Sequence, residues 1–160
     1  YNIIALSALK YHLLKVDPRK SMLFNPEESI DFQGNTGPFI QYTYARIQSI
    51  LKRAKMLKID FKGLNFDNVN KLSVNEKRII DLILKHRNNL KKSAETYSPS
   101  IVCNYIYDLS KTYNSFYQDE KIFDGKNNET TSFKIALSDM TSTIIRESLN
   151  TLGIDVVNKM

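Results

Sequence analysis

The stretch that decides the fold is GNTGPFIQYTYAR, residues 34–46. Gly37-Pro38 predicts the start of a helix, because proline suits the first helical position, and this helix should run to about Leu57. At 100° per residue, one face of the predicted helix is aliphatic and a separate edge is aromatic and basic. The aliphatic face carries Ile40, Ile47, Leu51 and Ala54, and the edge carries Phe39, Tyr42 and Arg46.

The aromatic and basic edge has two interpretations. Unstacked nucleic-acid bases need rings and guanidinium planes to stack on, and a cation to reach phosphate or a base edge. Each such stack contributes roughly 1–3 kcal/mol. Alternatively, Phe39 and Tyr42 pack on a neighbouring helix. Residue pattern alone leaves both interpretations open.

Four further segments have helical periodicity. The first covers residues 2–16 and is stopped by Asp17-Pro18, after which residues 17–37 form a long ordered connector. A capping box at Ser73 and Glu76 begins the next, whose buried stripe comprises Ile79, Ile80, Ile83, Leu84 and Leu90.

The remaining two helices follow the same logic. Ser98-Pro99 caps a helix that runs to about Tyr117. The last helix spans about 131–152 and ends at Gly153, which tolerates the left-handed conformation of a C-cap. The predicted buried stripes are Val102, Ile106, Leu109, Tyr113 and Phe116, then Ile135, Leu137, Met140, Ile144, Ile145 and Leu149. Residues 59–71 and 118–130 are predicted loops, with turn formers at Asn65, Asp67, Asn68, Asn70 and Asp124-Gly125.

Composition supports a helical protein. The chain has 160 residues, 42% of them hydrophobic, and only five glycines, which disfavours a turn-rich β-sandwich. No strand-like alternation is present, and no apolar run approaches the roughly 18 residues of a membrane span. The predicted fold class is an all-α helical bundle, preceded by a helix and an irregular junction.

Positive charge is concentrated in the middle of the chain. The net charge is +6, whereas residues 46–92 alone hold thirteen Lys or Arg and four Asp or Glu. A basic middle with an acidic remainder suggests a polyanionic partner. Candidate phosphate contacts are Lys52, Arg53, Lys55 and Lys58. The alternative is a lysine-rich surface that is merely solvated.

No catalytic or metal site is expected in this chain. His12 and His86 lack metal-ligand spacing and are predicted to be surface or interface histidines. The single cysteine, Cys103, is predicted to be a buried structural thiol, which fits a reducing compartment. Neither a GxxxxGKS phosphate loop nor a GxSxG elbow is present. The adjacent Glu27-Glu28 pair is unsuited to acid–base work because neighbouring side chains point different ways.

The segment LFNPEESIDFQGNTGPFIQYTYAR, residues 23–46, resembles the arginyl-tRNA synthetase family. Residues 8–11 (ALKY), 152–154 (LGI) and 159–160 (KM) resemble the same family, so the resemblance covers nearly the whole chain. It implies that residues 1–34 end a class I catalytic domain, and that 35–160 form the all-helical DALR anticodon-binding domain. The parent enzyme would join arginine to its tRNA using ATP and Mg²⁺, with catalytic signatures outside this chain.

The resemblance also implies which residues meet RNA. Tyr42 and Arg46 match the anticodon-facing tyrosine and arginine of the motif, and Phe39 matches a position that is often tyrosine. Tyr117 and Met160 match a second base-facing tyrosine and a closing methionine. All arginine codons share a central G, so the expected target is the central cytosine of the anticodon. The implied partners are the anticodon loop of arginine tRNA and the upstream catalytic domain of a monomeric, cytoplasmic enzyme.

Two other function classes remain open. A helical protein–protein docking module would expose an excess of aliphatic side chains. A non-specific RNA-binding domain would bind with strong salt dependence and no preference among anticodons.

Overall fold

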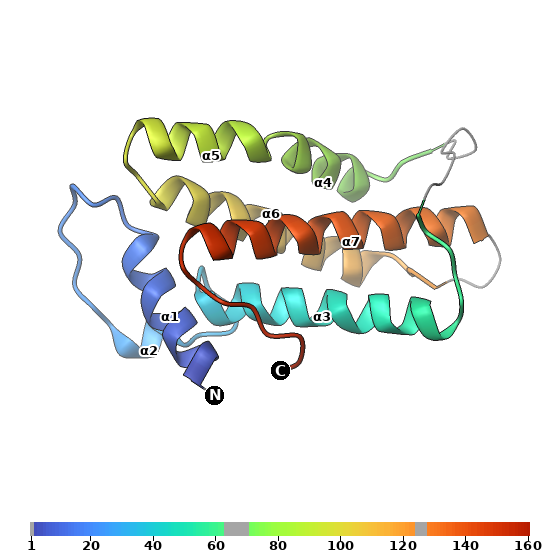
Figure 1. Ribbon diagram of the computed structural model, residues 1–160, viewed down its shortest axis with the longest axis horizontal. Coiled ribbons are helices and arrows are strands. Elements are labelled where there is room, and N and C mark those ends of the chain that lie inside the picture. The colour runs from blue at the N-terminus through green and yellow to red at the C-terminus, as the bar shows by residue number, and fades with distance from the viewer. Residues whose placement is uncertain (1, 63–70, 124–127) are drawn as a thin grey trace.

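The computed structural model describes residues 2–62, 71–123 and 128–160, and every regular element within these ranges is an α-helix. The helices are α1 (Asn2–Leu14), α2 (Pro26–Ser29), α3 (Gly37–Met56), α4 (Val74–Leu84), α5 (His86–Glu95), α6 (Ser100–Asp119) and α7 (Asn128–Thr151). The all-α expectation is therefore confirmed. Helices α3, α6 and α7 lie lengthwise, α4 and α5 follow one another along α6, and α1 lies across one end of α3 (Figure 1).

The core lies where α3, α6 and α7 meet. Its largest fully buried side chains include Ile40, Ile47, Ile106, Tyr113, Phe116, Ile145 and Leu149. Each contributes roughly 1.5–3 kcal/mol by leaving water. The predicted stripe of α6 is buried throughout, but Met140 of α7 is 51% exposed, so its assignment to the core was wrong. It lies at the edge of the buried face.

Local sequence sets the start of α3, as predicted. Thr36 precedes the helix, and its hydroxyl accepts a hydrogen bond from the Phe39 N–H at 3.3 Å. Gly37 faces α1 so closely that an added Cβ would lie 2.5 Å from the Ser7 carbonyl oxygen. A glycine is needed here because α1 and α3 approach each other backbone to backbone.

The predicted single helix after Ser73 is two helices. Its start is confirmed: Ser73 and Glu76 make both hydrogen bonds of a capping box. The helix then breaks at Lys85, and Leu84 is 73% exposed rather than buried. A tertiary contact accompanies the break, because the Tyr105 hydroxyl donates to the Leu82 carbonyl at 2.8 Å.

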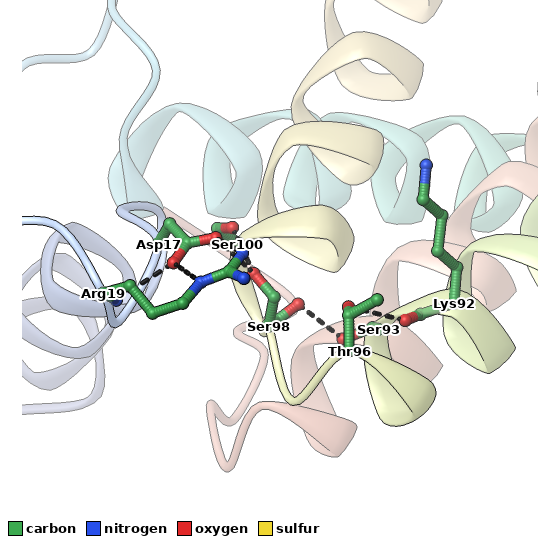
Figure 2. A network of polar contacts seen from close by, with 7 residues as sticks. All are labelled: Asp17, Arg19, Lys92, Ser93, Thr96, Ser98 and Ser100. Atoms are coloured by element: carbon green, nitrogen blue, oxygen red, sulfur yellow. Dashed lines mark hydrogen bonds and ion pairs between the residues drawn. The ribbon is translucent and has the colours of Figure 1, made fainter.

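The turn between α5 and α6 is tied to the connector that follows α1 (Figure 2). The Ser98 hydroxyl donates to the Asp17 carboxylate at 3.3 Å and lies 2.8 Å from the Ser100 hydroxyl. Ser98 is therefore not the side-chain N-cap that the sequence predicted. The helix instead begins after Pro99, which makes no side-chain cap. Arg19 forms an ion pair with Asp17 at 2.8 Å, and these bonds hold the pKa of that carboxyl below its ordinary value.

The connector also differs from the prediction. It contains the one-turn α2, capped by the Asn25 side chain. His12, predicted to be a surface or interface histidine, is buried in this structure, with its ring 5.3 Å from that of Phe24. His86 is also largely enclosed, 5.8 Å from the ring of Tyr105. Burial lowers the pKa of both histidines.

Two other predictions were right. Cys103 is fully buried, and burial raises the pKa of its thiol to about 12. Gly153 follows α7 with φ of +68°, the left-handed C-cap conformation. The predicted turn formers at Asn65, Asp67, Asn68, Asn70 and Asp124-Gly125 lie outside the described residues. Within the described ranges, no helix is both long and apolar enough to cross a bilayer.

Candidate nucleic-acid interface

A cavity of about 620 Å³ opens where three segments meet. One wall is the face of α3 between Tyr42 and Arg53. The second is the end of α6 and the segment that follows it, from Tyr117 to Phe123. The third is formed by Lys159 and Met160. The cavity is thus assembled from parts of the chain that lie far apart in sequence.

Arg46 lies between the two tyrosines of this cavity. Its guanidinium carbon is 4.8 Å from the ring centre of Tyr42 and 4.5 Å from that of Tyr117. Both distances are within the range of cation–π attraction, worth about 0.5–1 kcal/mol each at exposed sites. Tyr42 and Tyr117 are 44% and 41% exposed as whole residues. Two half-open aromatic rings with a fixed cation between them form a surface on which planar groups can stack.

A chain of hydrogen bonds fixes this arginine. Its guanidinium donates to the Asn114 side-chain oxygen. The Asn114 amide nitrogen in turn donates to the Thr43 hydroxyl at 2.8 Å, and Thr43 donates to the Phe39 carbonyl at 2.9 Å. Because Asn114 belongs to α6 and the other members to α3, this chain also joins the two walls.

A second cation–aromatic pair lies in the same cavity. The guanidinium carbon of Arg53 is 4.6 Å from the ring centre of Phe123. Arg53 is seven residues after Arg46, so two helical turns place both on one face of α3. Arg53 can therefore offer charge to a phosphate while its plane rests on a ring.

The cavity is electropositive despite one acidic residue in its wall. Glu120 accepts a hydrogen bond from the Ser73 hydroxyl and forms a 3.0 Å ion pair with Lys134. Both partners of this pair are largely buried, with side chains 15% and 13% exposed. The negative charge of the Glu120 carboxylate is therefore balanced by Lys134. Arg46, Arg53, Lys121 and Lys159 all line the cavity as cations, which favours an anionic ligand.

The family model described as the DALR anticodon binding domain matches residues 40–160. The chain belongs to the DALR anticodon-binding domain family. It is 48% identical, over its whole length, to an arginine–tRNA ligase from Flavobacterium psychrophilum and covers 26% of that protein. Across 99% of its length it is 48% identical to one from Bacteroides thetaiotaomicron, again covering 26%. This DALR chain therefore spans about a quarter of the curated relatives it matches.

Solved structures share the fold. An arginyl-tRNA synthetase from Thermus thermophilus superposes with a TM-score of 0.86 at 22% identity, over 99% of this chain and 27% of that one. The Plasmodium falciparum enzyme gives a TM-score of 0.85 at 26% identity, with the same two coverages. The helical arrangement is thus that of the matching region of arginyl-tRNA synthetases.

The structure brings together most of the sequence-predicted base-facing residues of this DALR chain. Tyr42, Arg46, Tyr117 and Met160 all line the cavity. Phe39 does not line it; its ring packs 5.5 Å from that of Tyr107. For Phe39 the geometry favours the packing alternative.

Of the predicted phosphate contacts, one lines the cavity and three do not. Arg53 lines the cavity, whereas the exposed side chains of Lys52, Lys55 and Lys58 lie outside it. Sequence reasoning missed Phe123, Lys121 and Lys159 as cavity residues. No local sequence pattern marks these three residues as neighbours of Arg46.

Proposed function

We propose that this DALR domain binds the anticodon loop of arginine tRNA as part of an arginine–tRNA ligase. The observation that carries the proposal is the placement of Arg46 between Tyr42 and Tyr117 on the wall of an electropositive cavity. The family resemblance assigns all three residues to anticodon contacts, Tyr42 and Arg46 through the sequence motif and Tyr117 through a match outside it. The relatives at 48% identity are arginine–tRNA ligases, which supports the same activity for the parent protein.

Recognition begins with stacking. Anticodon bases are single-stranded, so their faces are free to splay onto aromatic rings. Tyr42 and Tyr117 come from different helices and present half-exposed rings. Because the hydrogen bond between Arg46 and Asn114 restrains this arrangement from within the protein, stacking a base on it costs less conformational entropy. A stacked base then gains roughly 1–3 kcal/mol per ring.

The target within the loop is the central cytosine. Arginine codons share only their central G, so one enzyme that charges all arginine tRNAs can rely only on that position. Met160 offers an apolar, polarisable surface at the third wall. Arg53, Lys121 and Lys159 lie around the rings and are suited to the phosphates on either side of the base. Lys52, Lys55 and Lys58 add sequence-independent attraction from outside the cavity.

The rest of the ligase reaction belongs to the parent protein. Arginine activation would use ATP and Mg²⁺ in a class I catalytic domain, and residues 1–34 would be the end of that domain. Among the described residues, no group of three or more His, Cys, Asp or Glu is arranged to hold a metal ion. We propose a cytoplasmic, monomeric enzyme, with this chain contributing RNA recognition only.

The decisive experiment compares arginine tRNA with the same tRNA whose central anticodon cytosine is replaced. Affinities are measured across a salt series, for the chain and for the full-length protein. We expect the replacement to weaken binding at every salt concentration. Equal, strongly salt-dependent affinities would indicate a non-specific RNA-binding domain. No binding to either tRNA would refute the proposal and favour a protein docking module.

A further inference from the structure

The segment after α7 is anchored at only a few points before it reaches the cavity. It turns at Gly153, whose carbonyl accepts a hydrogen bond from the Lys10 ammonium of α1 at 2.6 Å. Ile154 then inserts into the core and is 2% exposed. Figure 1 shows this segment turning back from the end of α7 near α1 and passing α3. It ends with Lys159 and Met160 in the cavity wall.

One buried glutamine grips this segment at two further points. The Gln41 side-chain oxygen accepts from the Val157 N–H at 3.0 Å, and its amide nitrogen donates to the Asp155 carbonyl at 2.6 Å. The same nitrogen lies 3.2 Å from the Ser7 hydroxyl of α1, which accepts a second hydrogen bond. Gln41 is fully buried. A buried amide needs partners for both ends, so these bonds fix which way it faces.

This grip limits where the last residues can go. Met160 is three residues beyond Val157, a reach of about 10 Å at 3.3–3.6 Å per residue. Without the grip, the last fully buried anchor is Ile154, and Val156 packs against the core only partly buried. Met160 is four residues beyond Val156 and six beyond Ile154, which gives a reach of about 13–20 Å. The accessible volume grows as the cube of the reach and would be about two to eight times larger, so Lys159 and Met160 would spend less time in the cavity.

We infer that Gln41 is a positioning residue for RNA recognition: it holds Lys159 and Met160 in the anticodon cavity. Lys159 supplies a cation for an RNA phosphate, and Met160 an apolar contact for a base. Ser7 of α1 orients the Gln41 amide, so α1 contributes to the binding site through Gln41. The RNA part of this inference rests on the proposed function, whereas the placement of the tail does not.

The test is a double-mutant cycle with two readouts. Gln41→Met keeps the volume but removes all three hydrogen bonds, and the double substitution Lys159→Ala with Met160→Ala removes the positioned groups. Affinity for arginine tRNA is measured for each, and for the combination. Gln48→Met is the matched control. It lies on the same helix, and its side chain makes no hydrogen bond to the described tail residues.

We expect Gln41→Met to weaken tRNA binding by up to about eightfold, the ratio of accessible volumes. In the chain that already carries both alanines, Gln41→Met should cause no further loss of tRNA affinity, because the side chains that Gln41 positions are gone. A purely structural role would lower affinity equally in both backgrounds, and that result overturns the inference. So does an unchanged affinity for Gln41→Met when the unsubstituted chain binds tRNA.

The second readout needs no RNA. In Gln41→Met, amide hydrogen exchange at Val157 should accelerate, and the Met160 methyl resonance should move toward its random-coil position. The three other native methionines supply internal references, and the methyl introduced at position 41 is identified by its absence from the spectrum of the unsubstituted chain. An unchanged Met160 resonance in a folded variant refutes the positioning role. If the unsubstituted chain binds no tRNA, the proposed function fails, and the resonance still decides whether Gln41 positions the tail.

Discussion

Replacing Tyr42 with alanine separates a base-stacking tyrosine from a core tyrosine on the same helix. The loss of one stacked base should weaken binding of arginine tRNA by about 1–3 kcal/mol. At 1.4 kcal/mol per factor of ten, this corresponds to roughly 5- to 150-fold in Kd. Tyr42→Phe keeps the ring and should bind within a few-fold of the unsubstituted chain. The comparison therefore isolates the ring from its hydroxyl.

The structure also indicates how much a substitution at each tyrosine should lower the free energy of unfolding. Tyr42 is 44% exposed as a whole residue and its ring contacts Arg46, so Tyr42→Ala removes one cation–π interaction of about 0.5–1 kcal/mol and little core. Tyr44, two residues later, is 3% exposed. Its replacement by alanine should cost about 3–5 kcal/mol, as large aromatic deletions in cores do.

Two measurements test this reasoning. Urea denaturation gives the free energy of unfolding for each variant, and filter binding or anisotropy gives Kd for the tRNA. The expected pattern is a large binding defect with a small stability defect for Tyr42→Ala. A stability loss equal to that of Tyr44→Ala would assign Tyr42 to the core. Unchanged tRNA affinity in a folded Tyr42→Ala chain would refute the stacking role.

Three further outcomes are expected. Gly37→Ala should lower the free energy of unfolding by about 1–3 kcal/mol, because its Cβ would lie 2.5 Å from the Ser7 carbonyl oxygen; urea denaturation checks this. Burial lowers the His12 pKa, so as pH falls below 6.5 the unfolded chain takes up protons first and stability is lost. Melting curves from pH 7.5 to 5.5 should show a smaller loss for His12→Gln. Lys55→Gln should reduce the slope of log affinity against log salt by about 0.7 and leave the preference for central cytosine unchanged.

Helix ends were predictable because they depend on a few neighbouring residues. The capping box at Ser73 and the left-handed turn at Gly153 require no knowledge of tertiary contacts. The break at Lys85 was missed because no glycine or proline marks it. It accompanies a hydrogen bond from Tyr105, twenty residues away, to the last turn of α4. Ser98 was misassigned for a similar reason, since Asp17 from the distant connector takes its hydroxyl.

The candidate site likewise contains residues that local sequence could predict and residues that it could not. Tyr42 and Arg46 were predicted from one helix, where spacing of four residues fixes a shared face. Tyr117 and Met160 entered only through family resemblance. Phe123 and Lys159 were missed because they meet α3 only after the chain folds. No periodicity can reveal a wall that is built from a post-helix segment and a tail.

The walls of the cavity come from different parts of the chain, and this difference affects how the cavity can recognise RNA. The two tyrosines belong to α3 and α6, and the buried core together with the Arg46–Asn114 hydrogen bond fixes their separation. Contacts within the protein therefore hold that part of the cavity, so ordering it around a base costs little conformational entropy. The third wall has a different basis, because Lys159 and Met160 are exposed and depend on Gln41 for their placement. Selectivity should therefore reside in the helical walls, and the tail should tune how tightly the selected base is held.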